Sequence, residues 1–295
     1  GDAQGARLQG VERLIGSGSA DVLTGDGFAN VLIGGAGADR LTGGAGIDTA
    51  DYSASAAAVN AVLGGTGSGG DAEGDVLEGI ENLVGSGFGD VLIGDGAVNA
   101  LSGGGGDDRL AGKGGADRLD GGAGIDIADF STSASMVTAD LAAGTASDGV
   151  SLFAIEGLIG TAFDDVLNGD AGDNRLVGGK GADLLDGRDG LDTADYSGSA
   201  AAVQVDLALS VQGGTGDAAG DRLMSIEALV GSAFDDALAG VGADEALYGG
   251  AGADRLDGRG GDDLLQGGAG ADVLIGGDGI DTVDYSANAG AVSIN

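Results

Sequence analysis

The sequence has no cysteine, histidine, proline or tryptophan, and aromatic residues make up only 3% of its 295 residues. Without cysteine the chain has no disulfides and no thiolate chemistry, and without histidine it lacks the usual general base. The longest apolar runs are only a few residues, too short to span a bilayer as a helix. Basic residues are also scarce, 12 against 48 acidic ones, and the net charge of −36 argues against nucleic acid and membrane insertion.

Glycine and aspartate dominate what remains. The chain has 67 glycines, and only seven of its 48 acidic residues are glutamate. Aspartate is short, is accepted in turns, and binds hard cations through oxygen. A glycine-rich chain without a period would be disordered, so a repeat decides the fold class.

A nine-residue unit, G-G-x-G-x-D-x-L-x, fits residues 16–51, 85–129, 160–195 and 231–284 without gaps, in nineteen copies. Position six is Asp in fifteen copies, Asn in three and Glu in one. Glycine at positions one, two and four permits positive φ, so six residues can form a turn and three a short strand. We therefore expect an all-β solenoid in which two nonads make one coil, so that residues 18 apart stack.

This stacking sets aspartates one coil apart, and 12 basic residues cannot neutralise them. Carboxylate and carbonyl oxygens, without histidine or cysteine, favour Ca²⁺ over zinc, copper or Mg²⁺. The alternative is that aspartate serves only as a turn residue. Asn and Ser suit that role as well, so fifteen aspartates in nineteen copies favour the metal.

The nonad resembles the RTX, or hemolysin-type, calcium-binding repeat, which forms a β-helix that binds Ca²⁺. The resemblance implies a parallel β-roll with each calcium between a turn and the turn one coil later. An array of n nonads then has n−2 sites, eleven in this chain, which would bring the net charge from −36 to about −14. The position-six ligands are Asp21, Asn30, Asp39, Asp48, Asp90, Asn99, Asp108, Asp117, Asp126, Asp165, Asn174, Asp183, Asp192, Asp236, Glu245, Asp254, Asp263, Asp272 and Asp281.

The resemblance also implies carbonyl ligands, from positions two and four of the lower turn and positions one and three of the upper turn. They are Ser17, Ser19, Gly34, Ala36, Gly43, Ala45, Gly103, Gly104, Gly105, Gly106, Gly112, Gly114, Gly121, Ala123, Gly178, Lys180, Gly187, Asp189, Gly249, Gly250, Ala251, Gly252, Gly258, Gly260, Gly261, Gly267, Ala269, Gly276 and Asp278.

Some nonads depart from the pattern. The sites with Asn30, Asn99 and Asn174 lose a negative charge and are expected to bind calcium more weakly, and Glu245 adds a methylene. Position four is not glycine in seven nonads, all among the first two of an array, so we expect distorted entry turns. These seven residues are Ser19, Phe28, Phe88, Ala97, Phe163, Phe234 and Ala243.

The arrays alternate with connectors that also repeat. The expected divisions are array 1 at 1–53, a connector at 54–84, array 2 at 85–131, a connector at 132–159, array 3 at 160–197, a connector at 198–230, array 4 at 231–286 and the start of a further connector at 287–295. The connectors are too patterned for free linkers, so we expect one continuous solenoid that is a segment of a longer chain.

Within the connectors, Val203, Val205 and Leu207 alternate as in a half-buried strand, as do Val59, Ala61 and Leu63. The motif I-E-x-L, with Glu81, Glu156 and Glu227, stays in nonad register and is interpreted as one more turn with Glu at position six. Asp71, Asp75, Asp217 and Asp221 are further calcium ligands or a plain acidic loop. Tyr52, Phe130, Tyr196 and Tyr285 end the arrays, and a role as core plugs is favoured over ligand contact.

For function, the carboxylates are repeat elements rather than a singular catalytic pair, so no enzyme activity is expected. The first hypothesis is a calcium-binding structural region of a secreted or cell-surface bacterial protein, such as an adhesin, surface layer or filament, with copies stacking end to end. The second is the tail of a type I-secreted enzyme or toxin. Ice binding ranks low because Thr24, Thr42, Thr49 and Thr66 are scattered, whereas polysaccharide stays open as a partner.

Overall fold

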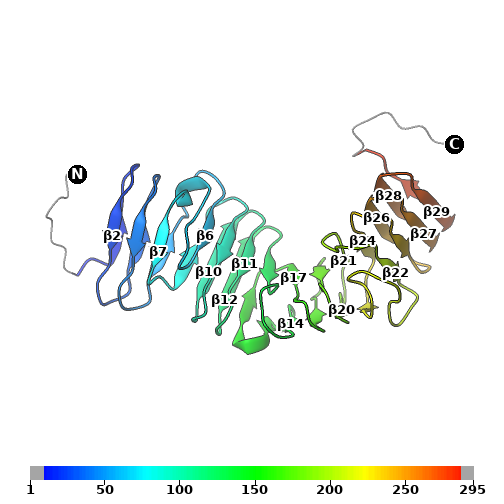
Figure 1. Cartoon of the computed structure of the whole chain (residues 1–295), viewed down its shortest axis with the longest axis horizontal. Coiled ribbons are helices and arrows are strands. Elements are labelled where there is room, and N and C mark those ends of the chain that lie inside the picture. Colours follow the sequence, from blue (N-terminus) through cyan, green and yellow to red (C-terminus); the bar gives the residue numbers. More distant parts are fainter. Residues whose placement is uncertain (1–9, 287–295) are drawn as a thin grey trace. The chain divides into compact units, whose positions relative to one another are not determined.

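The computed structural model describes residues 10–286, which form short strands joined by tight turns, with two 3-10 turns and no α-helix in this part of the chain (Figure 1). It divides into two compact units, one of residues 1–128 and 148–155 and the other of residues 129–147 and 156–295. The predicted all-β parallel roll is confirmed in each. The expected connector at 287–295 lies outside the described residues.

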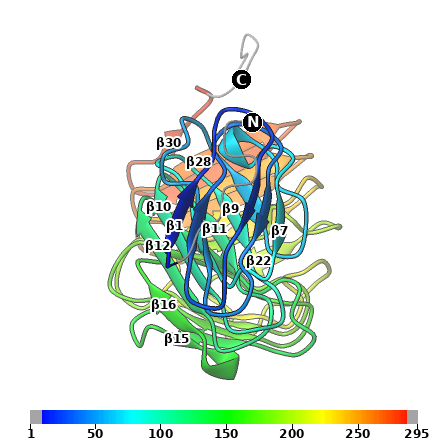
Figure 2. The ribbon, with the colours of Figure 1, turned by 90° about the vertical axis from the view of Figure 1, so that its left-hand side faces the viewer.

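In the first unit, β1, β3, β5, β8, β10, β12 and β16 form one parallel sheet. The opposite layer holds β2–β4–β7 and β6–β9–β11–β13, and Figure 2 shows the two layers face to face. The strands are β1 Arg13–Ile15, β2 Val22–Thr24, β3 Val31–Ile33, β4 Arg40–Thr42, β5 Thr49–Asp51, β6 Asn60–Val62, β7 Val76–Glu78, β8 Asn82–Val84, β9 Val91–Ile93, β10 Ala100–Gly105, β11 Arg109–Ala111, β12 Arg118–Ala123, β13 Ile127–Asp129 and β16 Ser151–Phe153, with a 3-10 turn at Gly70–Ala72.

The second unit repeats this plan. Its continuous sheet is β17–β19–β21–β24–β26–β28–β30, and its other layer holds β14–β18–β20–β23 and β22–β25–β27–β29. The strands are β14 Thr138–Asp140, β15 Thr145–Ala146, β17 Gly157–Ile159, β18 Val166–Asn168, β19 Arg175–Val177, β20 Leu184–Asp186, β21 Thr193–Asp195, β22 Gln204–Asp206, β23 Arg222–Met224, β24 Ala228–Val230, β25 Ala237–Ala239, β26 Ala246–Ala251, β27 Arg255–Gly260, β28 Leu264–Ala269, β29 Val273–Asp278 and β30 Thr282–Val283. The 3-10 turn Ser147–Gly149 lies at the boundary between the units.

The register confirms a coil of two nonads. Leu23 pairs with Leu41, and Leu14 with Leu32, each 18 residues apart. Side chains alternate along a strand, so the middle residue of each three-residue strand faces the interior. Leu32, Leu41 and Leu83 are therefore fully buried.

The connectors are folded parts of the roll. In the first, Val59, Ala61 and Leu63 are buried as predicted. Strand β6 pairs with β9, which follows it in the chain, whereas β7 pairs with β4, which precedes it. The segment between them closes the gap through antiparallel bridges, Asn60 to Ser68 and Thr66 to Val76. The first connector therefore splits one layer into two sheets while the other layer continues, and the third connector does the same.

Candidate metal centre

Stacking of the coils brings together all eleven predicted position-six pairs. In each pair the backbone N–H of the lower residue donates to Oδ1 of the aspartate 18 residues later, at 2.7 to 3.2 Å. Asp21 donates to Asp39 in this way, and Asp90 to Asp108. The pairs form acidic ladders along the edges of the roll.

The second carboxylate oxygen of many ladder aspartates lacks a hydrogen-bond donor. Among the described residues, Oδ2 is buried and without a hydrogen-bond partner in Asp39, Asp48, Asp108, Asp117, Asp183, Asp192, Asp254 and Asp263. A buried carboxylate oxygen without a donor is costly. A cation beside it removes that cost.

Backbone carbonyls converge on the same places. A Cβ built on Gly16 would lie 2.8 Å from Asp21 Oδ2 and would overlap the carbonyl oxygen of Gly34, one coil above. Ser17 O lies in the same way against Gly35, which has φ of 85°, a conformation that favours glycine. Oxygen atoms of two turns therefore share a space that a side chain would fill.

This convergence recurs in every predicted site. The position-one carbonyls that lie against the glycine one coil below are those of Gly34, Gly43, Gly103, Gly112, Gly121, Gly178, Gly187, Gly249, Gly258, Gly267 and Gly276. An all-oxygen set of carboxylates and carbonyls fits Ca²⁺. Ligation by each predicted residue, including the position-three carbonyls, stays a prediction.

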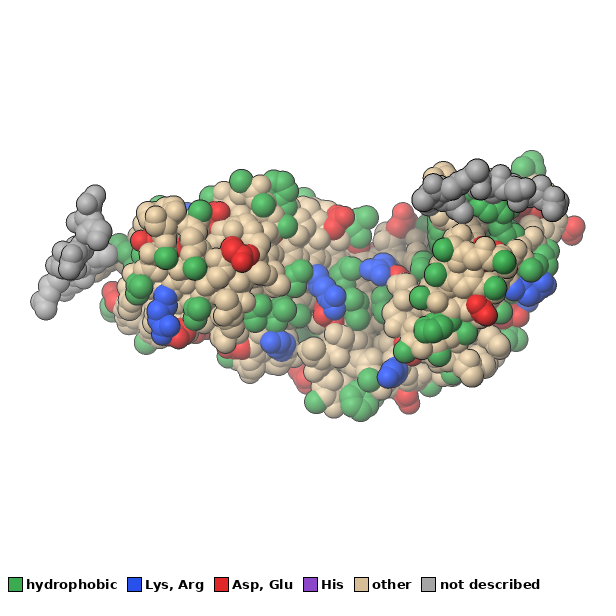
Figure 3. Space-filling view, turned by 45° about the horizontal axis from the view of Figure 1, so that its top comes forward, with side chains coloured by type: hydrophobic (Ala, Val, Ile, Leu, Met, Phe, Trp, Pro, Cys, Tyr) green, Lys and Arg blue, Asp and Glu red, His purple; other side chains and the backbone are tan. Residues whose placement is uncertain are grey.

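Burial makes several ladder carboxylates hard to ionise without a cation. Desolvation raises the pKa of Asp108 and of Asp183 to about 7, and that of Asp117 and of Asp192 to about 6. Neighbouring carboxylates, such as Asp126 beside Asp108, raise the pKa further. On the face shown in Figure 3 acidic side chains are scattered, although the net charge is −36, because most position-six carboxylates are buried.

The entry turns differ from the later turns, but not through irregular distortion. In the first two turns of each array the position-six side chain accepts the N–H of position two in its own turn, as Asp165 accepts Thr161 N–H at 2.5 Å. The Thr161 hydroxyl also donates to Asp165 and accepts the N–H of Phe163. Side chains thus close these turns in place of positive-φ glycines, which explains how Phe163 stands at position four.

The three asparagines have a role that the repeat pattern does not reveal. Asn30 Nδ2 donates to the carbonyl of Val11 at 3.2 Å, Asn99 Nδ2 to that of Glu81 at 3.1 Å, and Asn174 Nδ2 to that of Glu156 at 3.4 Å. A carboxylate at this position would face a carbonyl oxygen without a proton to share. The amide therefore joins the array to the coil below it.

The I-E-x-L turns keep the nonad register, but they are shorter than the turns of the arrays. Only Gly79, Ile80 and Glu81 separate β7 from β8. Glutamate nevertheless takes the ladder position, because Glu81 Oε2 accepts Asp48 N–H at 2.8 Å. The shorter turn thus carries the longer side chain. Glu227 does the same for Asp192 at 2.9 Å.

Two connector aspartates join the ladders. Asp75 Oδ1 accepts Asp39 N–H at 2.7 Å, and its Oδ2 accepts the Tyr52 hydroxyl at 3.0 Å. Asp221 is bound in the same way by Asp183 N–H and the Tyr196 hydroxyl. The alternative of a plain acidic loop is therefore wrong for these two residues. Asp71 and Asp217 instead donate their N–H groups to serine hydroxyls in the same loops.

The aromatic residues that end the arrays are core plugs, as favoured. Tyr52, Phe130 and Tyr196 are buried, whereas Tyr285 is half-buried. The buried Tyr52 hydroxyl has a raised pKa, because of desolvation first and of the neighbouring Asp75 second. It is therefore a permanent hydrogen-bond donor at neutral pH.

The family model for the RTX calcium-binding nonapeptide repeat matches residues 15–50, 75–110, 93–128, 159–194, 227–256 and 248–283. These matches span more than half of the 295 residues and include all four arrays. A search of curated proteins gave no match. No helix in the described part of the chain is long and apolar enough to cross a membrane. From the repeat, the roll and the acidic ladders together, the chain belongs to the family of RTX calcium-binding nonapeptide-repeat proteins.

Proposed function

We propose that this chain is a calcium-dependent structural region of a secreted or cell-surface bacterial protein, which folds when it meets calcium outside the cell. The observation that carries the proposal is the set of buried ladder carboxylates whose Oδ2 atoms have no donor, as in Asp108 and Asp254. Such carboxylates oppose folding until a cation arrives, so metal binding and folding are coupled.

Calcium concentration then acts as the signal for location. Extracellular calcium modules bind with dissociation constants of roughly 10⁻⁴ to 10⁻³ M, far above cytosolic calcium. About eleven ions would lower the net charge from −36 to about −14, which favours the compact state. The chain would stay unfolded during synthesis and export, and would become a stiff roll outside.

Far-UV circular dichroism of the calcium-stripped chain tests the proposal. We expect an unfolded spectrum in EDTA, a β-sheet spectrum in millimolar calcium, and no comparable change with magnesium. Isothermal titration in parallel would count the ions. A β-sheet spectrum in EDTA equal to that in calcium would refute calcium-dependent folding.

A second candidate is the secretion and stabilisation tail of a type I-secreted enzyme or toxin. Four arrays joined by folded connectors favour the structural role in an adhesin, surface layer or filament, where length itself is useful. In both cases we propose that this segment is not catalytic, because its carboxylates serve the repeat. Attaching the chain to a reporter enzyme would separate the two: rescue of reporter secretion and folding supports the tail, and end-to-end assembly supports the filament.

A further inference from the structure

The ladders meet the connectors at places where protein side chains supply the positive or donor groups. At the end of array 3, Asp221 is fully buried, and its two oxygens accept Asp183 N–H at 2.9 Å and the Tyr196 hydroxyl at 3.0 Å. The three atoms nearest to a Cβ built on Gly178 all belong to Asp183, whereas in the predicted sites a carbonyl from the next coil lies there too. The phenol therefore serves the upper carboxylate of a step that has fewer oxygen ligands, in which Asp183 Oδ2 has no hydrogen-bond partner of its own.

The three connectors show that this tyrosine and this aspartate occur together. Tyr52 is matched by Asp75, and Tyr196 by Asp221. At the corresponding positions of the second connector stand Phe130 and Val150, since Val150 precedes β16 as Asp75 precedes β7. The hydroxyl is present where a carboxylate needs it and absent where none is present.

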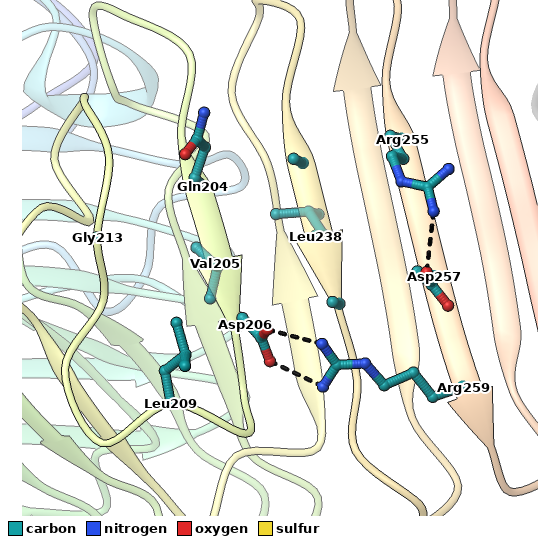
Figure 4. A pocket seen from close by; sticks show the side chains of 11 residues that line it. Gln204, Val205, Asp206, Leu209, Gly213, Leu238, Arg255, Asp257 and Arg259 are labelled. Carbon is teal, nitrogen blue, oxygen red and sulfur yellow. Dashed lines mark hydrogen bonds and ion pairs between the residues drawn. The ribbon is translucent and has the colours of Figure 1, made fainter.

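A second device lies where an array begins. Figure 4 shows Arg259 reaching across β25 to Asp206, the last residue of β22. Its guanidinium donates to both Asp206 oxygens, at 2.8 and 2.6 Å, and to the carbonyl of Gly240 at 2.8 Å. Gly240 is position one of its turn, so the guanidinium joins a carboxylate and a position-one carbonyl, the two ligand types of the predicted calcium sites.

The same clamp recurs in array 3. Arg188 donates to both oxygens of Asp140 and to the carbonyl of Gly169 at 2.8 Å. Through the strand register, the residue equivalent to Asp140 and Asp206 in the first connector is Val62. There the equivalent of the arginine is Lys113. The arginine, like the tyrosine, accompanies its aspartate.

The backbone gives independent support for the arginine clamp. Arg188, Arg259 and Lys113 occupy position two of a turn with φ of 75°, 72° and 71°, a left-handed conformation that other turns fill with glycine such as Gly250. A side chain there is strained by roughly 1 kcal/mol or more. An arginine without stabilising contacts would not offset this backbone strain.

We propose that side chains close the calcium ladders in place of a further ion: a tyrosine phenol where arrays 1 and 3 end, and an arginine guanidinium where arrays 3 and 4 begin. These joints are metal-free positions in a metal-dependent roll. The inference rests on the proposed calcium ladders. Its tests compare variants in saturating calcium, so a failure of calcium-dependent folding would already show in the unchanged chain.

Tyr196→Phe tests the array end. We expect a lower urea midpoint in saturating calcium and an unchanged number of bound ions by equilibrium dialysis. The double variant Tyr196→Phe/Asp221→Val, which copies Phe130 and Val150, should recover most of the lost midpoint. An unchanged midpoint in Tyr196→Phe, an additional bound ion, or a double variant no better than the single one would overturn the proposal for the array end.

Arg259→Gly tests the array beginning, and the direction of the change in urea midpoint gives the answer. Glycine relieves the strain of the left-handed backbone, so the midpoint would rise if the arginine side chain made no stabilising contact. We expect such a rise for the control Lys113→Gly. If Arg259 clamps the joint, Arg259→Gly lowers the midpoint, and Arg255→Gln, at an exposed pair with Asp257 in the same pocket, changes it little. A rise in Arg259→Gly equal to that in Lys113→Gly would overturn the clamp.

Discussion

At the scale of single residues, glycine at position one is needed because it has no side chain to fill the space beside the ladder oxygens. A Cβ on Gly103 would overlap Asp108 Oδ2, and it would lie 2.7 Å from the carbonyl oxygen of Gly121. These are the oxygen atoms that the predicted calcium site gathers. Glycine is therefore required here by its neighbours as well as by its own backbone.

We expect Gly103→Ala to lower calcium affinity by more than tenfold and to destabilise the calcium-bound chain by about 2 to 4 kcal/mol, because the methyl group displaces ligands in a packed turn. The control is Gly87→Ala, where a Cβ meets nothing within 4 Å. Calcium titration and urea unfolding of both variants give the comparison. Equal effects in the two variants would show that the space at Gly103 is not needed for metal.

The sequence predicts the ladder residues well, because each position-six acid recurs every nine residues and the coil holds two nonads. It does not predict why Asn99 replaces an aspartate. Its amide bonds the Glu81 carbonyl of the coil below, a contact across 18 residues that no local pattern announces. Likewise, the period alone could not show that the Ser86 hydroxyl closes an entry turn by donating to Asp90.

At the scale of elements, the roll has turns of two lengths. The six-residue turns of the arrays mostly end in aspartate, whereas the three-residue turn at Gly79–Glu81 ends in a glutamate, which stands level with Asp48 because Asn82 pairs with Thr49. The shorter turn thus carries the longer side chain. The repeat pattern predicted the acid in the right place but not the length of the turn. The nine-residue spacing is kept because strand β7 takes the place of the first half of the turn.

Side-chain length at position 81 should therefore matter more than charge. Glu81→Gln keeps an oxygen acceptor for Asp48 N–H, and we expect a loss of less than about 1 kcal/mol. Glu81→Asp keeps the charge but cannot reach, and leaves a buried N–H unsatisfied at a cost of about 1 to 3 kcal/mol. Urea midpoints in saturating calcium rank the variants, and an aspartate variant more stable than the glutamine variant would contradict the role of side-chain length.

At the scale of the whole molecule, protons and calcium compete for the same carboxylates. Burial raises the pKa of Asp108 and of Asp183 to about 7 from an ordinary value of 3.8. Between about pH 4 and about pH 7 the folded metal-free chain thus binds more protons than the unfolded chain, so its stability falls as pH rises.

Acidification should therefore replace part of what calcium does. We expect the calcium-stripped chain to gain β-sheet circular dichroism as pH falls from about 7 to about 5, while calcium affinity declines over the same range because ligands must be deprotonated. High salt at neutral pH is the control, because it screens repulsion without adding protons. Loss of order on acidification would show that burial of the carboxylates does not govern folding.

Because strands alternate between two layers, it matters whether the number of nonads between two connectors is even or odd. In the first unit, five nonads of array 2 separate the connector strands β6 and β7 from β16, and β16 lies in the opposite layer. In the second unit, four nonads of array 3 separate β14 from β22 and β23, and all three lie in the same layer. An even count keeps successive connectors on one side, and an odd count moves the next to the other. Gain or loss of a single nonad would therefore move every later connector to the opposite layer. Gain or loss of two nonads would change only the length of the roll.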